Sequence, residues 1–565
     1  MKKSYLSGWL LCYALFTGGV SVAQQYDGLT FYSNMNSAVG YLIDTNSTVV
    51  KTYNFTGNTG YSTHFMPGGN FYRTVTNSGN AINGGGVTGR IQKLDYNGTI
   101  LWDYTYSSST YVLHHDHCPL PNGNVLVISY DVKTASDLAA AGGTANLTSI
   151  RSEKIMELQP VGTNSAIVVW QWNLWDHLVQ NTDASKNNYQ TSIVNHPELM
   201  NINYQPSQDW MHMNGVDYNP VLDQIAFSSH ALNEWYIIDH STSTAEAASH
   251  TGGNSSKGGD FLYRWGNPAA YQASGTKILN VTHDAHWVPE GCPDAGYLSG
   301  VNNGGQTSPS QKTTFEKVSS PRVDYNYTIT SGSAYTPGTY NTRIVGTGYT
   351  SNMGNIQQFP NANQLICLAT SGTIYEIDPN GITLWTKSTG GTCPQTERQT
   401  LCFLTNPAPT QPTVTSNGTV LTTASATTYQ WYMNGNAVAG ATQQSFTPSQ
   451  SGIYVVRVTD TNGCVYAYSP GFKFTTTGSV TGLNLGDLDS QVALYPNPVE
   501  NVLNINVSTD HTNYLVAIRD VSGKIIASEK NATSIDMNNM PAGLYFIEIH
   551  VTGANSIIKK VIHTK

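Results

Sequence analysis

The chain has 565 residues, carries a formal net charge of −9, and contains only 11% charged residues. It has no basic block, which argues against nucleic acid and anionic membrane surfaces as partners. Tyrosine (34 residues) and glycine (52 residues) are abundant while leucine-rich helical runs are missing, so the composition favours an all-β protein with many turns.

The N-terminus has the features of a secretory signal peptide. Lys2 and Lys3 precede an apolar stretch over residues 9–16, and Ser21-Val22-Ala23 forms a cleavage site of the A-x-A type. We therefore predict a signal peptide at residues 1–23. No other stretch reaches the roughly 20 apolar residues of a membrane helix, so we expect the rest of the chain to be exported whole.

A hairpin motif, H-D-x-x-x-[LV]-P-x-G, occurs twice in the chain, beginning at His115 and at His283. In both copies the histidine lies six residues before the proline of the turn. The same offset from looser copies of the turn extends the series. In chain order the positions are Tyr61, His115, His212, His283 and Gly354.

Three histidines thus share one position in a repeated hairpin. Repeated β units pack around a common axis, so equivalent positions face the same place. A single histidine in a strand is most often structural, but three in register indicate a site. We predict that these residues lie on the innermost strands and face one central cavity.

A second repeat consists of a short apolar strand, a polar turn and another strand. Its six copies begin at Tyr41, Ile91, Ile155, Tyr236, Phe315 and Ile374. Four of them lead to a tryptophan in the next strand, namely Trp102, Trp170, Trp265 and Trp385. Paired strands at this spacing predict a β-propeller, in which radial closure protects the sheet edges. We assign residues 24–405 to a six-bladed β-propeller.

Six cysteines remain once the signal peptide is removed. An exported protein can hold disulfides, and Cys393 with Cys402 is the most local candidate pair. The chain has no C-x-x-C pair, so we expect no structural zinc site. We assign no metal ligand and no cofactor-binding residue.

The composition changes at a proline-rich linker, residues 406–412. In residues 413–477, an alternating strand around Trp431 and a later strand around Tyr454 resemble bacterial immunoglobulin-like modules. Cys464 is the only cysteine there, so the inter-sheet bridge of such modules is missing. A second linker near residues 478–490 precedes residues 491–565, whose alternating strands predict a small β-sandwich.

This tail carries three motifs of one kind of secretion signal. They are Tyr495-Pro496-Asn497-Pro498, Asp520-Val521-Ser522-Gly523-Lys524 and Gly543-Leu544-Tyr545. As a set they resemble the C-terminal sorting domain read by the type IX secretion machinery. The resemblance implies that this machinery is a partner and that the chain crosses the periplasm and the outer membrane to reach the cell surface or the medium.

Several segments between residues 85 and 385 resemble the bacterial aryl-sulfate sulfotransferases that use no nucleotide sulfate donor. The matching segments are His114-His115-Asp116, Leu120-Pro121-Asn122-Gly123-Asn124, Asp176-His177-Leu178, Asp209-Trp210-Met211-His212-Met213-Asn214, Ile238-Asp239-His240-Ser241-Thr242, Tyr263-Arg264-Trp265-Gly266-Asn267-Pro268 and His283-Asp284-Ala285-His286-Trp287. The resemblance rests on the order of these segments and on how many of them occur within about 300 residues. The family fold is a six-bladed propeller, which agrees with the count from the repeats.

The resemblance implies sulfuryl transfer from a phenolic sulfate ester to another phenol through a covalent sulfohistidine, with no cofactor. His283 matches the nucleophile, His115 and His212 match two other channel histidines, and Asn214 matches the asparagine of an H-x-N motif. The residue types suit this chemistry, because a neutral imidazole is a good nucleophile. Donors aimed at the sulfuryl oxygens would stabilise the transition state.

One position departs from the family, where an arginine often stands eighteen residues after the H-x-N histidine. Here that position is His230, in Ser228-Ser229-His230. Arginine offers a permanent bidentate charge, whereas histidine offers one donor with a pH-dependent charge. The departure predicts weaker sulfate binding, a lower pH optimum or a different donor. The candidate substrate-binding residues are therefore Asn214, His230 and Tyr61.

Two other functions fit the same sequence. One is a non-catalytic, surface-exposed propeller that binds a phenolic or glycan ligand. The other is a sulfatase that hands the sulfuryl group to water. Attachment of a sulfuryl group to a histidine separates the first from an enzyme, and dependence on added phenol separates the second from a transferase.

Overall fold

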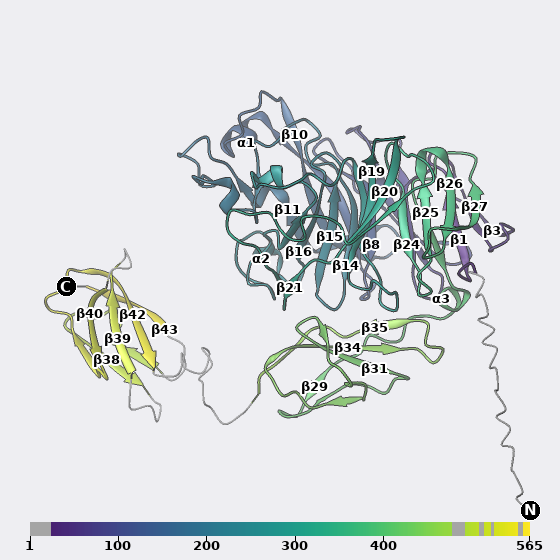
Figure 1. The fold of residues 1–565 in the computed structure, drawn as a ribbon. Coiled ribbons are helices and arrows are strands. Elements are labelled where there is room, and N and C mark those ends of the chain that lie inside the picture. Colours follow the sequence, from purple (N-terminus) through teal and green to yellow (C-terminus); the bar gives the residue numbers. More distant parts are fainter. Residues whose placement is uncertain (1–23, 477–491, 508–513, 521–524, 552–556, 565) are drawn as a thin grey trace, which may run out of the picture. The chain divides into compact units, whose positions relative to one another are not determined.

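The computed structural model describes residues 24–476, 492–507, 514–520, 525–551 and 557–564. The predicted signal peptide and the predicted linker at residues 478–490 lie outside these ranges. By its contacts the chain divides into two compact units, Met1–Phe474 and Thr475–Lys565 (Figure 1). Strands make up most of the regular structure of both, which confirms the all-β class. None of the helices in the described ranges is long and apolar enough to span a membrane.

Residues 29–399 form six four-stranded antiparallel sheets, written here from first to fourth strand. The first two are β28 (Thr396–Gln399), β1 (Leu29–Ser33), β2 (Val39–Ile43), β3 (Val49–Asn54), and β4 (Thr59–Phe65), β5 (Phe71–Thr76), β6 (Gly89–Leu94), β7 (Ile100–Thr105). The next two are β8 (Tyr111–Pro119), β9 (Val125–Thr134), β10 (Ser149–Val161), β11 (Ser165–Asn173), and β14 (Met213–Asn219), β15 (Gln224–Ser229), β16 (Glu234–Asp239), β17 (Tyr263–Trp265). The last two are β18 (Thr282–Trp287), β19 (Leu298–Gln306), β20 (Lys312–Val318), β23 (Thr342–Val345), and β24 (Asn355–Gln358), β25 (Gln364–Leu368), β26 (Thr373–Ile377), β27 (Thr383–Ser388).

Short elements lie between these sheets or follow them. They are α1 (Ala135–Ala140), η1 (Leu174–Asp176), β12 (Leu178–Val179), η2 (Ile193–Asn195), β13 (Met200–Asn201), α2 (Thr244–Ala247), η3 (Pro268–Tyr271), β21 (Arg322–Val323), β22 (Asn326–Tyr327), η4 (Ala369–Ser371) and α3 (Leu401–Thr405). The helices are short, and the capping boxes at Thr134 and Ser243 define where α1 and α2 begin.

The apolar segment of the second sequence repeat occupies the third strand in each of the six sheets. Its copies lie in the third strands β2, β6, β10, β16, β20 and β26, and the tryptophans lie in the fourth strands β7, β11, β17 and β27. The apolar residues of these strands are buried, among them Ile43, Leu94, Leu158, Ile238, Val318 and Ile377. Trp102 shows how a fourth strand is held, because its indole N–H donates to the Ser165 carbonyl at 2.6 Å.

The first strands of the six sheets contact one another in series. β4 contacts β8, β8 contacts β14, and the series continues through β18, β24 and β28 back to β4. A carboxylate strengthens four of these contacts by accepting a backbone N–H from another first strand. The pairs are Asp116 with Val216 at 3.3 Å, Asp217 with Trp287 at 2.8 Å, Asp284 with Ile356 at 3.2 Å and Glu397 with Phe65 at 2.7 Å. Hydrogen bonds to an ionised group are stronger than neutral ones, so they fix the alignment of adjacent sheets.

Residues 415–474 follow as a pair of sheets in the same unit (Figure 1). One contains β29 (Thr415–Ser416), β30 (Leu421–Thr422) and β33 (Ser445–Phe446), and the other contains β32 (Asn436–Ala437), β31 (Tyr429–Met433), β34 (Gly452–Thr459), β35 (Tyr466–Tyr468) and β36 (Phe472–Phe474). Trp431 is fully buried in their core. The pair contacts the six-sheet region, where the Tyr432 hydroxyl donates to Glu290 at 2.7 Å and Arg457 pairs with Glu290 at 3.1 Å.

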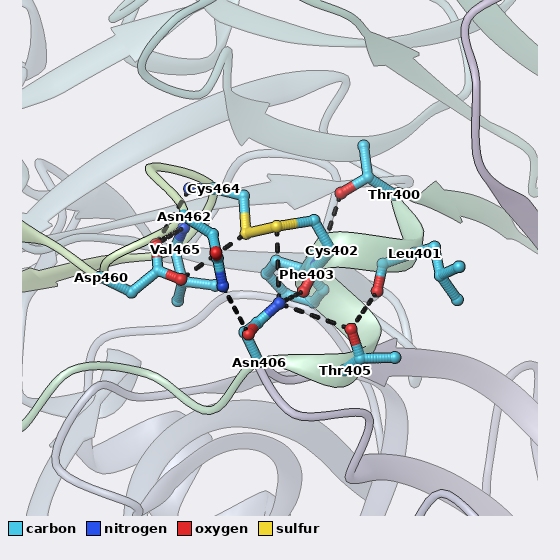
Figure 2. Close-up of a disulfide and its surroundings, with 10 residues drawn as sticks. All are labelled: Thr400, Leu401, Cys402, Phe403, Thr405, Asn406, Asp460, Asn462, Cys464 and Val465. Carbon is cyan, nitrogen blue, oxygen red and sulfur yellow. Dashed lines mark hydrogen bonds between the residues drawn. A yellow bond between two sulfur atoms is a disulfide. The ribbon is translucent and has the colours of Figure 1, made fainter.

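A disulfide also joins these two regions, between Cys402 and Cys464 (Figure 2). The prediction that Cys393 pairs with Cys402 is therefore wrong. Cys393 is buried, and its Sγ donates to the Gln395 carbonyl at 3.2 Å. Cys402 instead lies on α3, which begins directly after β28 and places this cysteine beside the loop that carries Cys464, so sequence proximity did not predict the pair.

The second unit holds two further sheets. They are β37 (Val492–Tyr495), β38 (Val502–Val507), β41 (Ser534–Asp536), and β40 (Ile525–Lys530), β39 (Tyr514–Arg519), β42 (Gly543–Val551), β43 (Ile557–His563). Their shared core includes Leu503, Ile518, Ile547 and Val561, all buried. The unit therefore has a hydrophobic core of its own.

Candidate functional site

Five of the six predicted site residues line one cavity of about 270 Å³. The residues that line this cavity, hereafter the histidine cavity, are Met35, Tyr61, Gly85, Gly86, His115, His212, His230, His283, Asn352 and Met353. Tyr61, His115 and His283 lie on the first strands β4, β8 and β18, and His212 directly precedes β14. The structure thus places together the three histidines that share one position in the repeated hairpin.

An irregular backbone presents these side chains. The pairing register shifts between Leu113 and His117 in β8, and between His283 and His286 in β18. His115 has a φ of 49° and His212 a φ of 53°, in the left-handed region that non-glycine residues rarely adopt. Backbone strain of this kind persists where the surroundings enforce it and is concentrated at functional sites.

Gly86 helps to hold His115 in its left-handed backbone conformation. The amide of His115 donates to the Gly86 carbonyl at 2.7 Å. Gly86 has a φ of 66°, and a Cβ placed there would lie 2.1 Å from the His115 ring. Only glycine fits this position, because any side chain would displace the imidazole.

The rings around the cavity form a continuous series. Centroid distances are 4.9 Å for Tyr61 and His115, 4.7 Å for His115 and His212, 4.8 Å for His212 and His230, and 5.4 Å for His230 and His283. The four imidazoles therefore lie close enough for their charges to interact. A charge on one of them disfavours a charge on the next.

The tautomer of His283 follows from its contact with Asn303. His283 Nδ1 lies 2.7 Å from Asn303 Oδ1. Asn303 Nδ2 donates to the carbonyls of Thr350 and Met353, at 3.0 and 2.9 Å, which identifies Oδ1 as the acceptor. Nδ1 of His283 therefore carries the proton, and Nε2 keeps its lone pair.

Burial and the nearby imidazoles keep His283 neutral. Burial, and then the proximity of His230, lower the pKa of His283 well below 6.5, although the bond to Asn303 opposes this shift. The same causes, burial first and then His212, lower the pKa of His230 to about 4. This shift favours a neutral His230 ring, which offers a single N–H donor to the cavity.

A buried chain of hydrogen bonds runs from His115 to Glu153. His115 Nδ1 lies 2.9 Å from His114 Nδ1, and His114 Nε2 lies 2.9 Å from Glu153 Oε2. Burial raises the pKa of Glu153 well above 4.5, and burial lowers the pKa of His114 to about 3. With both groups neutral, Glu153 donates to His114 and His114 donates to His115, so His115 presents an N–H at Nε2.

His212 has a different partner. Its Nδ1 lies 2.8 Å from Asp209 Oδ2. Burial opposes ionisation of Asp209, but the bond to His212 and the smaller effects of Tyr130 and His114 together outweigh it, so the pKa of Asp209 is lowered. The ionised carboxylate accepts the proton at Nδ1, which leaves Nε2 of His212 for proton transfer. Carboxylate–imidazole pairs of this kind support general acid–base chemistry.

The hydroxyl of Tyr61 is buried, and in the described part of the chain it has no hydrogen-bond partner. Burial raises the pKa of Tyr61 well above 10, so the group remains a neutral donor. A buried hydroxyl without a partner costs free energy, of the order of 1–3 kcal/mol. Its place at the histidine cavity leaves it free to bind a ligand atom.

Asn214 is the sixth predicted residue, and it does not line the histidine cavity. It is fully buried, donates from Nδ2 to the Thr282 carbonyl at 2.8 Å, and accepts from Ser228 Oγ at 2.7 Å. The expectation that its amide faces the substrate does not fit this geometry. It instead bonds β18 one residue before His283.

Sequence reasoning missed Asn303, His114 and Glu153. His114 is adjacent to His115 and was part of the family resemblance, but no role was assigned to it. Asn303 and Glu153 reach the site only through strand packing, so no local pattern identified them. His177 and His240 do not bond the aspartates that precede them, because they pair instead with Asp260 and Asp223 at 2.8 and 2.7 Å.

Two other groups of side chains in the described ranges have the spacing of metal ligands. They are His64 with Asp116 and His117, and His177 with His250 and Asp260. Neither group contains a residue of the histidine cavity. Each already contains a histidine–carboxylate hydrogen bond, at 3.0 Å between His64 and Asp116 and 2.8 Å between His177 and Asp260.

Residues 20–388 match the model of a family described as Arylsulfotransferase (ASST), and residues 493–564 match the Secretion system C-terminal sorting domain. No curated protein matches the chain. Among solved structures, a protein of unknown function from Bacteroides caccae is 11% identical, with 66% of this chain and 98% of that chain covered and a TM-score of 0.37. Apo AztD from Citrobacter koseri is 10% identical, with 66% and 98% covered and a TM-score of 0.30. These TM-scores are too low to bear on function.

Proposed function

The chain belongs to the arylsulfotransferase family, and from that premise we propose that it moves a sulfuryl group from a phenolic sulfate ester to a phenolic acceptor through a sulfohistidine at His283. Family membership supports a sulfotransferase function on small aryl substrates. The observation that carries the finer proposal is the neutral His283, whose Nδ1 proton is held by Asn303 and whose Nε2 lone pair is available in a cavity lined by other donors.

In the first half-reaction, the Nε2 lone pair of His283 forms a bond to the ester sulfur, and the bond from sulfur to the phenolic oxygen breaks. The N–H at Nε2 of His115 gives its proton to the departing oxygen. His115 recovers a proton through His114 from Glu153. General acid catalysis of this kind contributes about 10²–10⁴-fold.

The transferring group spreads negative charge over its three oxygens, so donors that point at them lower the barrier. The Tyr61 hydroxyl and the His230 ring are placed at the cavity to supply such donors. Asn303 accepts the Nδ1 proton of His283 throughout, which stabilises the sulfated ring. Asn214 positions His283 by fixing the backbone at Thr282.

In the second half-reaction, a phenol enters and gives its proton to the Nε2 atom of His212 or of His115. Its oxygen bonds to the sulfur as the bond from sulfur to His283 Nε2 breaks. The ionised Asp209 supports His212 in this role, because the bond to Nδ1 fixes the orientation of the ring. When this proton has returned to Glu153 through His115 and His114, the enzyme is back in its starting state, with a new aryl sulfate as product.

The catalytic region, residues 24–405, forms six blades of a propeller in this proposal. The serial contacts among the six first strands and the closure of the first sheet by β28 support it. Residues 413–477 act as an immunoglobulin-like spacer, which the buried Trp431 between two small sheets supports. The sorting domain at residues 493–564 indicates export across the outer membrane to the cell surface or beyond, by the type IX machinery.

The test is to trap the intermediate. Wild-type protein incubated with p-nitrophenyl sulfate and no acceptor should release p-nitrophenol in a burst and carry one sulfuryl group on His283, detected by peptide mass spectrometry at alkaline pH. Addition of phenol should remove the group and yield phenyl sulfate. Steady release of inorganic sulfate at the same rate without phenol would indicate a sulfatase. Absence of both burst and modification would indicate a non-catalytic binding propeller.

A further inference from the structure

A second cavity, of about 470 Å³, lies further along the same first strands. Tyr61, His115, His212 and His283 line the histidine cavity, whereas residues one to four positions later in the chain line the second one. These later residues are Thr63, His64, Asp116, His117, Val216, Asp284 and His286. Pro409 of the linker and the strand β35 complete its lining. We call it the proline-rimmed cavity.

Its wall is mainly apolar and aromatic. Pro67, Pro119, Pro121, Pro289 and Pro409 contribute to it, as do Phe65, Trp287 and Tyr466. Apolar walls with a few convergent polar groups are typical of sites for small organic molecules, and 300–1,000 Å³ is the usual volume range. Flat aromatic walls of this kind suit an aromatic ring.

One polar side chain in this cavity lacks a partner. Gln395 is only 7% exposed, and neither its Nε2 nor its Oε1 has a hydrogen-bond partner among the described residues. Within these ranges the same holds for Nε2 of His117, which is fully buried. A buried, unpaired amide destabilises the folded protein. A ligand that offered both a donor and an acceptor would remove this cost.

The charged groups of the cavity are mostly carboxyl groups. Asp116, Asp217, Asp284 and Glu397 line it. His64 lies 3.0 Å from Asp116 and 3.6 Å from Glu397, and His286 lies 3.3 Å from Asp284. The carboxyl groups also accept backbone N–H groups. Because they outnumber the imidazoles paired with them, the cavity disfavours an anionic ligand. A sulfate ester, which is an anion, fits the wall but not this electrostatic balance.

We propose that the proline-rimmed cavity binds an uncharged aromatic carboxamide, whose amide pairs with Gln395 while its ring packs on the apolar wall. A carboxamide presents one donor beside one acceptor, which is the complement of the Gln395 amide. The site lies outside the sulfuryl-transfer machinery. The proposal of this binding site is therefore independent of the proposed function.

Benzamide is the probe, because it has no hydroxyl to sulfate and no charge. Isothermal titration calorimetry with the mature protein should show one site for benzamide without any sulfate donor present. Gln395→Leu should weaken that binding about tenfold or more, as expected for loss of a paired amide. Gln364→Leu is the matched control, since Gln364 is 5% exposed but lines neither cavity, and it should bind benzamide as wild type does.

Thermal unfolding provides the second measurement. Without ligand, Gln395→Leu should be at least as stable as wild type, because the leucine removes an unpaired buried amide. Three results would overturn the proposal: no heat of binding for benzamide, unchanged affinity in Gln395→Leu, or affinity that depends on His283→Ala instead. A marked loss of stability in Gln395→Leu would overturn it as well, since the amide would then serve the fold.

Discussion

The two cavities differ in the partners of their histidines, although burial also lowers the pKa of His117, at the proline-rimmed cavity, to about 3. In the histidine cavity, burial and neighbouring imidazoles lower the pKa of His115 and of His283 well below 6.5. In the proline-rimmed cavity, burial acts in the same direction, but hydrogen bonds to Asp116 and Glu397 raise the pKa of His64 to about 10. Carboxylates likewise raise the pKa of His286 to about 9 against the effect of burial.

The difference lies in the partners and not in the burial. His283 is bonded to an amide and His115 to another imidazole, while His64 and His286 face carboxylates. A neutral partner leaves desolvation dominant, whereas an anion reverses it. The first arrangement preserves a nucleophile and the second preserves a structural ion pair. The predictions below test this contrast, starting with the largest expected effect.

His283→Ala should abolish turnover of aryl sulfates, because the proposed mechanism carries the sulfuryl unit on Nε2 of His283. Initial-rate measurements with p-nitrophenyl sulfate check this. His250→Ala is the control, since its side chain is 60% exposed and lies outside both cavities. Undiminished turnover in His283→Ala would remove the basis of the mechanism.

His115→Ala and His212→Ala should each slow turnover by about 10²-fold or more, because each loses a proton-transfer group. The rate with a donor whose phenol is a good leaving group should suffer less in His115→Ala than the rate with a poor one. Equal losses for both donors would argue against His115 as the acid.

Asn303→Asp gives His283 a carboxylate partner, like the partners of His64. The new carboxylate should raise the pKa of His283, so the acidic limb of kcat/KM should move upward by about 1–2 pH units. Asn303→Leu is the control, because it removes the acceptor without adding charge and should lower kcat/KM without that shift. An unchanged pH profile in Asn303→Asp would show that Asn303 does not contact the reacting ring.

The pH dependence of stability should show both kinds of histidine. His115, His230 and His283 have lowered pKa values, so their contribution is complete above about pH 6.5 and is lost as the pH falls toward 4. His64 and His286 have raised values, so their contribution is complete below about pH 6.5 and is lost as the pH rises through 9 to 10.

The unfolding temperature should therefore be highest near pH 6.5, as scanning calorimetry can measure. His64→Gln should reduce the decline on the alkaline side only. A stability curve that His64→Gln leaves unchanged would mean that His64 is not charged in the folded protein.

His230→Arg should have the smallest effect. It adds a permanent charge to a cavity whose imidazoles are neutral, and it should lower KM for the anionic aryl sulfate by about 3–10-fold. His230→Gln keeps a neutral donor and should leave KM close to that of wild type. Equal KM values in all three proteins would show that residue 230 does not contact the donor.

The sequence by itself determined the repeated architecture and identified five of the residues that line the histidine cavity. The six-residue offset placed Tyr61, His115, His212 and His283 on equivalent strands, because a repeated hairpin must repeat its geometry. The third strands were equally visible, because their buried apolar residues recur in each of the six repeats. The tail motifs also indicated the secretion route, because each of them is a short run of consecutive residues.

Only the tertiary structure decided which neighbours each of these residues meets. Asn303 lies on β19, the strand paired with the one that carries His283, whereas Glu153 and Gln395 come from more distant segments, and no local pattern reveals these contacts. The same is true of Cys402 and Cys464, which are separated by 62 residues. The sequence shows where each histidine stands in the chain. The charge of its ring depends on the groups within hydrogen-bond distance, and the packing of the sheets decides which groups these are.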